Sequence, residues 1–415
     1  MRVLHIVTAF PRCEGDVITP WLAEMLRGLK GRGIDVEVFT SSYQGLGGQV
    51  LWGIPVHRFR YFLPRWENLT HEEMAVDRMG RSPLYKLLPA FYLLFGCLAV
   101  WKLCRMNKYD VVHVHWPLPH ALFGWIAGKA CGAGLVTTFY GAEVRWAKHS
   151  RLPFLKSFLS WAARVSDRVI AISTYTAGEV GTIVDVPVEV IPYTIGFSDE
   201  SKREKKDVRR EPFDCLGTAR HKCAQGKKSE VGKKMVLTVG RLVERKGIRY
   251  LIDAMRLLPV SLNAELVVVG GGPLKGELEE QARAHGLGDR VKFAGKVSEQ
   301  ELIDYYRNAA VYVQPAIIDS RGDTEMLGVV LLEAMHYGVP VVASKVGGIT
   351  DVVRDGETGL LVPGKDPNEL ALGIQRLLND VQLRHKVTVN AKKSLATNYK
   401  WDKILQKIVN VYSNL

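Results

Sequence analysis

The chain has 415 residues, of which 47% are hydrophobic and 24% are charged, and its formal net charge is +13. The length predicts two domains, and the composition is ordinary for a globular protein with two cores. The basic excess does not indicate a nucleic-acid-binding protein. Residues 201–235 hold 12 Lys/Arg against 5 Asp/Glu and, apart from Phe213, lack the aromatic residues on which bases stack. This segment is therefore predicted to be a flexible, solvated linker.

No apolar run reaches the length of a membrane-spanning helix, and the chain opens directly with an apolar strand at 3–7. We therefore expect no cleavable secretory signal and a cytoplasmic location. The six cysteines form no C-x-x-C pair and have no nearby histidine at zinc-ligand spacing. They are interpreted as reduced thiols.

The first forty residues predict a strand, a loop, a helix over 21–30 and a second strand over 36–40. This βαβ beginning predicts a parallel, doubly wound sheet with ligands at the carboxyl ends of its strands. Gly15 lies in the first such loop. Later strands are expected at 110–116, 135–138, 169–173 and 188–192.

The apolar run 87–101, followed by Lys102 and Arg105, has two interpretations. It is either a helix buried in the first domain, which we favour, or a basic-flanked helix that rests on a membrane. Just before it, basic and aromatic residues alternate. They fit either a membrane-facing surface or an ordinary core with surface charge, and the group consists of Arg58, Tyr61, Phe62, Arg60, Arg65 and Trp66.

In the second half, a strand over 235–239 runs directly into GRLVERKG. Arg241 and Lys246 there lie five residues apart between glycines, where a diphosphate would rest. Arginine can fork two phosphate oxygens, and lysine adds a mobile charge. A second bare loop, 270–273, follows the next strand, but its glycine spacing is not G-x-G-x-x-G, so a dinucleotide fingerprint is weak.

The stretch 323–342 reads DTEMLGVVLLEAMHYGVPVV. A helix that begins near Leu327 would turn unpaired N–H groups and the positive end of its dipole towards a phosphate. Glu333 would lie further along this helix, and its carboxylate can accept two hydrogen bonds from the vicinal hydroxyls of a ribose.

Glu325 and Glu333, with the continuation GGITDVVRDGETGLLVPGKDPNELA, resemble the E-x(7)-E signature of the family 4 retaining glycosyltransferases, also called group 1. The GR…KG element fits the same family. The resemblance implies the α/β GT-B fold, with two Rossmann-like doubly wound domains facing across a cleft. The implied parts are an acceptor-binding domain (1–198), a basic flexible linker (199–233), a nucleotide-sugar-binding domain (234–397) and a C-terminal helix (398–415) that crosses back to the first domain.

The resemblance also assigns the site. The residues implied for catalysis are Arg241, Lys246 and Glu325. Those implied for binding the nucleotide sugar are Gly15, Gly240, Gly270, Gly272, Lys296, Val297, Met326, Leu327, Gly328 and Glu333. Those implied on the acceptor or sugar side are His115, Tyr140, Gly141 and Glu143. Here the chain departs from the family, because Tyr140 stands where many relatives have a histidine, and tyrosine is a poor base near neutral pH.

The implied activity is transfer of a hexose from an NDP-sugar to an acceptor hydroxyl of a polysaccharide, glycolipid or lipid-linked sugar, with retention of configuration, in cell-envelope polysaccharide biosynthesis. No metal or other cofactor is expected, since the chain has no Asp-x-Asp pair to clamp a diphosphate through a cation. The expected partners are the nucleotide sugar and a saccharide or glycolipid acceptor, without nucleic acid, and peripheral contact with an anionic membrane stays open. The alternatives are a GT-B sugar-nucleotide epimerase, a catalytically silent nucleotide-sugar-binding protein and, as an outsider, an NAD-dependent oxidoreductase.

Overall fold

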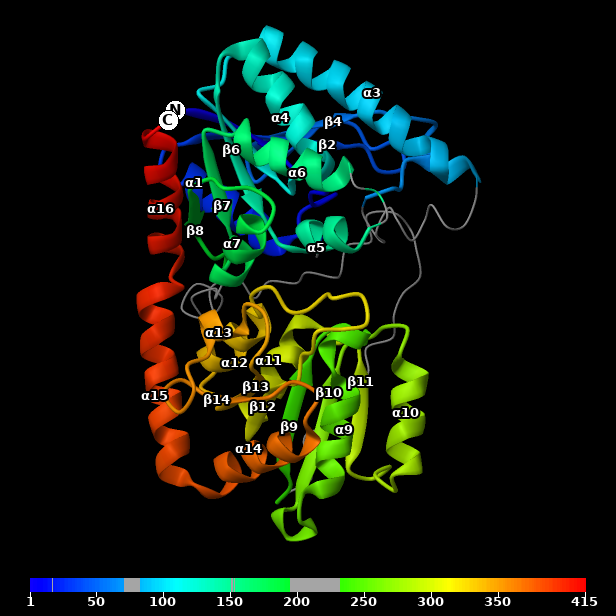
Figure 1. Cartoon of the computed structure of the whole chain (residues 1–415), viewed down its shortest axis with the longest axis vertical. Helices are drawn as coiled ribbons and strands as arrows, with labels where there is room; N and C mark the ends of the chain where they lie inside the picture. Colours follow the sequence, from blue (N-terminus) through cyan, green and yellow to red (C-terminus); the bar gives the residue numbers. More distant parts are fainter. Residues whose placement is uncertain (17, 71–82, 151, 153, 195–231) are drawn as a thin grey trace, which may run out of the picture. The chain divides into compact units, whose positions relative to one another are not determined.

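The computed structural model describes residues 1–16, 18–70, 83–150, 152, 154–194 and 232–415. These residues divide into two compact units (Figure 1). Unit 1 contains 1–172, 176–194 and Trp401–Leu415, and unit 2 contains Ser173–Tyr175 and 232–400. All but the last two residues of the predicted linker 199–233 lie outside the described residues. The two units are described separately below.

Unit 1 is built on an eight-stranded sheet of order β3-β4-β2-β1-β5-β6-β7-β8. All neighbouring strands are parallel except β3 and β4, which form an antiparallel pair. The strands are β1 (Arg2–Ile6), β2 (Asp35–Ser41), β3 (Gln49–Leu51), β4 (Ile54–Phe59), β5 (Val111–His115), β6 (Gly134–Phe139), β7 (Arg168–Ala171) and β8 (Val188–Val190). Because the strand order reverses between β1 and β5, the loops that follow these two strands flank the point where such sheets bind ligands.

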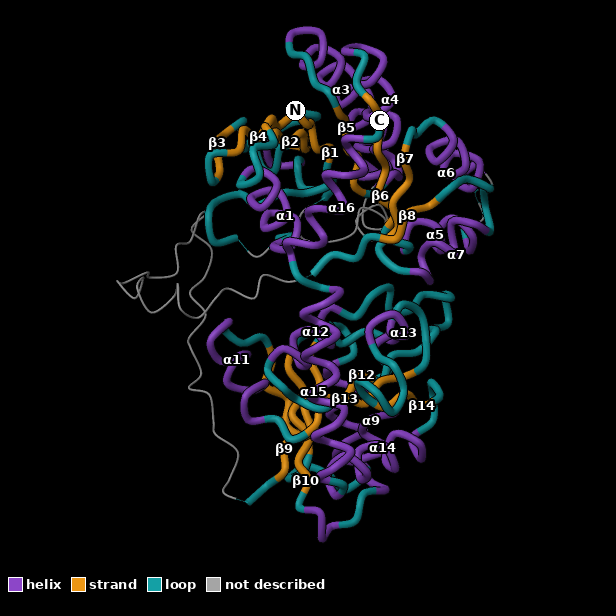
Figure 2. The backbone as a smooth tube through the Cα atoms, turned by 90° about the vertical axis from the view of Figure 1, so that its left-hand side faces the viewer, coloured by secondary structure: helices purple, strands orange, loops and turns teal. Residues whose placement is uncertain are grey.

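Helices cover both faces of this sheet. The helices α1 (Pro20–Lys30) and α16 (Trp401–Ser413) pack side by side on one face, with Leu26 and Ile408 buried in the same cluster as Val3 and Val111 (Figures 1 and 2). On the other face, α3 (Pro83–Met106) and α4 (Pro117–Cys131) enclose a second core with Leu4 and Val112. The remaining elements are η1 (Pro64–Trp66), α5 (Ala142–His149), α6 (Phe154–Arg164) and α7 (Thr174–Gly181).

Helix α3 corrects two expectations. It extends beyond the run 87–101 in both directions, and the segment Tyr85–Met106 is long and apolar enough, by length and composition alone, to cross a membrane. It is also not a buried core helix, since only 28% of its most apolar window is buried. The sequence run understated the helix because it stopped at Lys102, whereas a lysine at the edge of a helix does not end it.

The arginines that precede α3 also differ from expectation. Arg58 is buried and donates hydrogen bonds to the carbonyl oxygens of Pro11 (2.6 Å) and Phe10 (3.3 Å). Arg60 donates to the buried carboxylate of Glu67 at 2.7 Å. Arg58 and Tyr61 are buried and therefore cannot face lipid, whereas Arg60 is half exposed while it pairs with Glu67.

Unit 2 has a six-stranded, wholly parallel sheet of order β11-β10-β9-β12-β13-β14. Its strands are β9 (Lys234–Val239), β10 (Ala264–Val269), β11 (Val291–Gly295), β12 (Val311–Gln314), β13 (Val341–Ser344) and β14 (Leu360–Val362). The runs Met235–Leu237 and Leu266–Val269 are buried throughout, as expected of parallel strands covered on both faces. The strand order reverses between β9 and β12.

The helices of unit 2 also form two layers (Figure 1). Helices α9 (Ile248–Leu257), α10 (Lys275–Ala284) and α14 (Pro367–Asn379) share one core with the sheet. The other helical elements are η2 (Glu244–Lys246), η3 (Val260–Leu262), α11 (Glu299–Asn308), α12 (Val329–His336), α13 (Ile349–Val352) and α15 (Val381–Asn398). Helix α15 belongs to unit 2, whereas α16, which follows it, belongs to unit 1.

The cysteines correct a further expectation. Cys97, Cys104 and Cys131 are free thiols, but Cys13 is disulfide-bonded. The six cysteines are therefore not all reduced, and their spacing in the sequence gives no hint of this pairing.

Candidate functional site

The principal candidate site lies in unit 2, at the carboxyl ends of β9 and β12, where the strand order reverses. The loops that follow the two strands are tied together there. The Ile317 N–H donates to the Arg245 carbonyl at 2.9 Å, and the Ser320 hydroxyl donates to Glu244 at 2.7 Å. Gly247 lets the two loops meet, because a Cβ at this residue would lie 1.9 Å from the Pro315 carbonyl oxygen.

Glu325 is at the centre of this site. Its side chain is 13% exposed, and its carboxylate accepts hydrogen bonds from Lys246 and, at 3.3 Å, from Gln314. The Arg245 guanidinium lies 3.5 Å from the same carboxylate and 3.4 Å from Asp323. Burial favours the neutral acid, but the charges of Lys246 and Arg245 outweigh it and lower the pKa of Glu325 below its ordinary value. The site thus holds an ionised carboxylate beside two cations.

The GR…KG element contributes three cations at this end of the sheet, and they differ in their contacts. Arg241 is exposed and makes no side-chain hydrogen bond or ion pair with any residue that the structure describes. Arg245, which sequence reasoning passed over, is the second cation beside Glu325. Gln314 was missed as well. Gln314 could have been found from the sequence, because it is a polar residue at the carboxyl end of the buried strand β12. Ligands bind at this edge of a parallel sheet.

Glu333 lies on α12 and is part of a different contact. Its carboxylate accepts a hydrogen bond from the Tyr306 hydroxyl of α11 at 2.5 Å. Burial raises the pKa of Glu333 above its ordinary value, although this hydrogen bond opposes the shift. Tyr306 is 1% exposed, so the bond also fixes Glu333 against the body of the unit. Sequence reasoning missed Tyr306 as the partner of Glu333, because the two residues lie on different helices.

The segment between the two glutamates is held by a pair of glycines. The Gly348 N–H donates to the Glu325 carbonyl at 2.9 Å. A Cβ at Gly347 would lie 2.0 Å from that carbonyl oxygen, and one at Gly348 would lie 1.9 Å from the Met326 carbonyl oxygen. Gly328, with φ +84°, is the N-cap of α12. Met326 and Leu327 bury their side chains, so this segment can offer a ligand only its backbone and the N-terminus of α12.

The remaining predicted nucleotide-sugar residues lie in three places. Gly240 and Gly270 touch each other at the ends of β9 and β10, where a Cβ at Gly270 would lie 2.0 Å from the Gly240 carbonyl oxygen. A Cβ at Gly272 would lie 2.5 Å from the Leu242 carbonyl oxygen. Lys296 is exposed and Val297 half-buried after β11. Gly15 lies exposed in the loop after β1, in unit 1.

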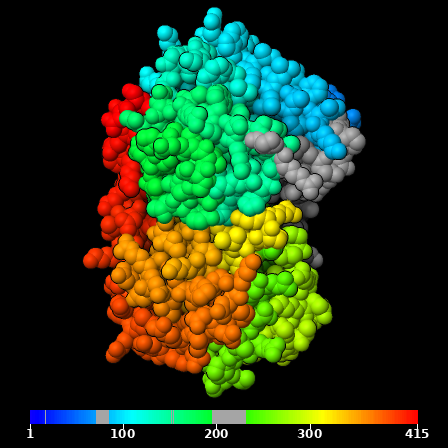
Figure 3. All heavy atoms as spheres, in the orientation of Figure 1, coloured from blue at the N-terminus to red at the C-terminus, as the bar shows by residue number. Residues whose placement is uncertain are grey.

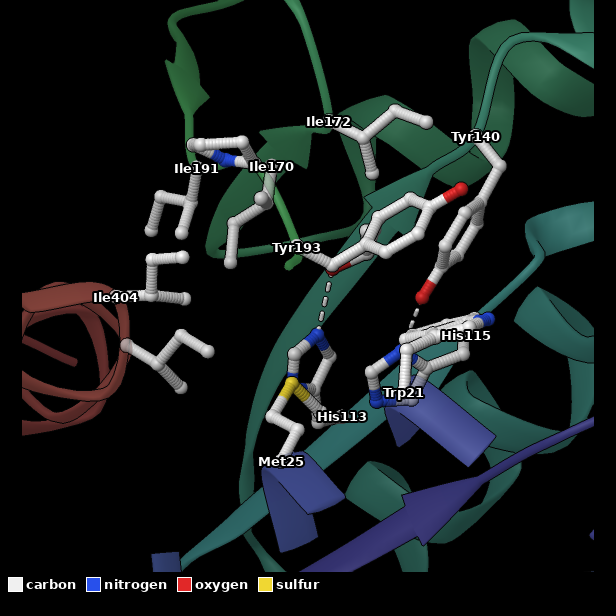
Figure 4. A pocket seen from close by; sticks show the side chains of 13 residues that line it. Trp21, Met25, His113, His115, Tyr140, Ile170, Ile172, Ile191, Tyr193 and Ile404 are labelled. Carbon is white, nitrogen blue, oxygen red and sulfur yellow. Dashed lines mark hydrogen bonds between the residues drawn. The ribbon is translucent and has the colours of Figure 1, made fainter. Parts of the chain in front are cut away.

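In unit 1, the four predicted acceptor-side residues lie at the carboxyl ends of β5 and β6. Figure 4 shows two of them, His115 and Tyr140. His115 Nδ1 and the Tyr140 hydroxyl are 2.9 Å apart, and the Tyr140 N–H donates to Glu143 Oε1 at 2.7 Å. Gly141, with φ +93°, is the N-cap of α5 and lets the chain turn between them. Burial raises the pKa of Glu143 to about 7, and its other oxygen, Oε2, has no hydrogen-bond partner among the described residues. The side chains of His115, Tyr140 and Glu143 are all buried.

His115 also belongs to a buried hydrogen-bond network that we did not predict from the sequence. His5 Nδ1 lies 3.0 Å from His115 Nε2, while the nitrogens of His113 lie 2.6 Å from the Tyr412 hydroxyl of α16 and 2.7 Å from Thr138 Oγ1. Burial and the neighbouring imidazoles lower the pKa of His113 well below its ordinary value, so this ring is neutral.

The three imidazoles have nitrogens within 4.8 Å of one another, which is the spacing of a candidate metal site. Every ring nitrogen except His5 Nε2 has a hydrogen-bond partner, however, and a metal would have to displace these bonds. The cavity beside His113 and His115, lined also by Trp21 and Tyr193, has a volume of about 20 Å³ (Figure 4). It could hold about one water molecule and no sugar.

Comparison with protein families gives two matches that together span most of the chain. Residues 18–194 match the family "Glycosyl transferase 4-like domain", and residues 221–394 match "Glycosyl transferases group 1". An uncharacterized glycosyltransferase of Methanocaldococcus jannaschii is 30% identical over 408 residues, covering 94% of this chain and 92% of the relative. A GDP-mannose-dependent alpha-(1-6)-phosphatidylinositol monomannoside mannosyltransferase of Mycobacterium tuberculosis is 27% identical over 89% of this chain and 93% of the relative.

Among solved structures, Anabaena HepE in complex with UDP and glucose is similar over 100% of both chains, with a TM-score of 0.68 and 20% sequence identity. At this identity the likeness concerns the fold alone. It confirms the GT-B fold class expected from the sequence, which two parallel-sheet α/β units also fit.

Proposed function

Because the chain belongs to the group 1 glycosyltransferases, we propose that it transfers a hexose from an NDP-sugar to an acceptor hydroxyl with retention of configuration. The observation that carries this proposal is the joint placement of Lys246, Arg245 and Glu325 at the switch point of unit 2, with Glu333 on the following helix. Such an arrangement suits a ligand that combines a diphosphate with a ribose and a second sugar.

Each group has a role in the proposed reaction. A lysine ammonium has three donors, so Lys246 can hold Glu325 and a phosphate oxygen together. Lys246, the exposed Arg241 and the N-terminus of α12 would stabilise the charge that develops on the leaving diphosphate. Glu333 would accept hydrogen bonds from the ribose hydroxyls, and Glu325 from hydroxyls of the transferred sugar.

The bonds that change are the same in any such transfer. The bond from the anomeric carbon to the diphosphate oxygen breaks, and a bond to the acceptor oxygen forms on the same face. The acceptor's proton goes to the departing diphosphate, so the mechanism needs no protein base. This fits the absence of a histidine at Tyr140. We further propose that the reaction needs no metal, since cationic side chains lie where a metal would otherwise neutralise the diphosphate.

The acceptor is proposed to be a saccharide, or a glycolipid reached at the inner face of a membrane. The similarity to a mannosyltransferase whose name specifies a phosphatidylinositol monomannoside supports the lipid class at 27% identity.

A panel of UDP-, GDP- and ADP-hexoses, each labelled in the sugar, tests the proposal when incubated with the protein and a lipid or saccharide extract. We expect that one of the donors releases its NDP, that this release requires the added extract, and that the labelled sugar becomes attached to a component of the extract. A changed sugar still attached to its nucleotide would indicate an epimerase. Binding without release would indicate a silent nucleotide-sugar-binding protein.

A further inference from the structure

Helix α3 has an apolar face that the described residues leave largely exposed, although Phe62 packs against Phe91 at its edge. The side chains of Leu87, Leu94, Leu98 and Trp101 are 59%, 55%, 54% and 49% exposed, and Phe91 and Phe95 are also exposed. At about 100° per residue, these six positions fall within one arc of about 120° on the helix. Figure 3 shows the atoms of α3, in light blue, at the surface of unit 1. We call this set the α3 face.

The opposite side of α3 is fixed in the core of unit 1. Leu88 and Val100 are fully buried, and Tyr92 is 4% exposed. Phe123 of α4 packs so closely that a Cβ at Gly96 would lie 2.4 Å from its ring. A helix anchored in this way cannot cross a bilayer without giving up that core. It can, however, lie in the plane of the interface with its free face in the lipid.

The charges beside the α3 face indicate what covers it. The sequences of α3, α4 and α6 contain no aspartate or glutamate at all, whereas Lys86, Lys102 and Arg105 are exposed on α3 itself. The Arg105 guanidinium lies 5.4 Å from the centre of the Trp101 ring. An indole with a cation beside it, at the end of an apolar stripe, suits the boundary between acyl chains and headgroups.

We propose that the α3 face docks unit 1 on an anionic lipid bilayer, with Leu87 to Trp101 in the acyl boundary and Lys102 and Arg105 at the headgroups. An apolar surface of this extent on one helix is otherwise an association liability. A lipid acceptor presented by the same membrane would follow only if the proposed function is correct. The docking itself is independent of the proposed function, and it is measured without donor or acceptor.

Flotation of the full-length protein tests the docking, with vesicles of phosphatidylcholine alone and of phosphatidylcholine mixed with phosphatidylglycerol. The wild type is expected to float with the anionic vesicles and much less with the neutral ones. The double variant Leu94→Gln/Leu98→Gln should lower the affinity on the order of tenfold or more. Lys102→Gln/Arg105→Gln should lower it about fivefold for each charge and weaken its dependence on salt.

The matched control is Leu372→Gln/Val381→Gln, which changes two residues of unit 2 that are 53% and 64% exposed. It should float like the wild type. Lipids brominated in their acyl chains should quench the tryptophan fluorescence of the wild type more strongly than that of Trp101→Phe. This difference would show that Trp101 itself enters the bilayer. All variants change exposed side chains, and thermal unfolding confirms that they fold.

Three results would overturn the proposal. The first is no flotation on anionic vesicles at low salt. The second is a wild-type dimer that Leu94→Gln/Leu98→Gln converts to a monomer without any flotation, which would make the α3 face an interface between copies of this chain. The third is resistance to extraction by alkaline carbonate, which would mean that α3 spans the bilayer.

Discussion

Lys246 donates a hydrogen bond to Glu325 at the carboxyl ends of β9 and β12, although 79 residues separate them in the chain. The pair is nearly buried, with side-chain exposures of 12% and 13%. Charges at this position are screened less by water than surface charges are. Either charge without its partner would destabilise the folded protein. In the proposed function, a diphosphate that enters this site would meet cations already fixed in position by a carboxylate.

Replacing Lys246 or Arg241 with alanine should each lower kcat on the order of a hundredfold or more, because positive charge is lost beside the leaving diphosphate. The two variants should differ in stability. Arg241→Ala changes an exposed side chain and should leave the thermal unfolding temperature unchanged. Lys246→Ala removes a cation beside the nearly buried Glu325 carboxylate and should lower that temperature. The control is Arg249→Ala, since Arg249 is 55% exposed and pairs only at the surface with Glu277. Turnover at the wild-type rate in either variant would contradict the assignment of the phosphate site.

Gly348→Ala should weaken binding of the nucleotide sugar, since the added Cβ would lie 1.9 Å from the Met326 carbonyl oxygen and displace the segment before α12. The matched control is Gly276→Ala on α10, where a Cβ meets nothing within 4 Å. Titration calorimetry with the donor nucleotide compares the two. Equal affinities would mean that the backbone of 326–328 does not contact the ligand.

Tyr306→Phe removes the hydrogen bond to Glu333 and should raise the already raised pKa of that carboxyl further. Protonated Glu333 is a poorer acceptor for ribose hydroxyls, so donor affinity should fall as the pH is lowered through this pKa, and the fall should begin at a higher pH in the variant. Tyr305→Phe, the neighbouring half-buried tyrosine, is the control. The measurement is donor affinity as a function of pH for both variants. The same pH profile for Tyr306→Phe and Tyr305→Phe would contradict the role of Glu333 in binding the ribose.

Glu143→Gln should change how stability depends on pH. The folded protein holds the pKa of Glu143 at about 7, above the ordinary 4.5, so between these values the folded state binds more protons than the unfolded state. Its contribution to stability is therefore lost as the pH rises from about 4.5 to 7, by about 3 kcal/mol in all. The buried histidines act in the opposite direction, so the comparison with the variant isolates Glu143.

The wild type should lose stability relative to Glu143→Gln between pH 5 and pH 8, as measured by denaturant unfolding. Glu189→Gln, at an exposed position of β8, is the control. A difference between wild type and Glu143→Gln that does not change with pH would show that this carboxylate is already ionised at low pH.

The sequence predicted the strands and the glycine loops well, because both follow from local rules. Buried parallel strands are continuous apolar runs, and glycine stands where backbone approaches backbone, as at Gly247 and Gly348. Lys246 could be found because it lies directly beside Gly247, and Glu325 because, with Glu333, it resembles the E-x(7)-E signature.

What the sequence could not supply were contacts between distant segments. Nothing in the chain near Glu333 points to Tyr306, and nothing near His113 points to Tyr412, since both pairs form only when separate elements pack. That Arg245 lies beside Glu325 likewise became visible only once η2 was placed against the loop after β12. Composition cannot tell an apolar helix that is buried on one side, such as α3, from one that is buried all round.

In the proposed reaction, a hexose leaves its NDP carrier at the Lys246 site and reaches an acceptor without a metal. A decisive assay follows NDP release and sugar transfer together, with the preferred donor and in excess EDTA, for the wild type and Lys246→Ala. We expect one NDP released for each hexose transferred by the wild type, and both signals lowered on the order of a hundredfold in the variant. Complete loss of wild-type activity in EDTA, restored by magnesium or manganese, would contradict it, as would an unimpaired variant.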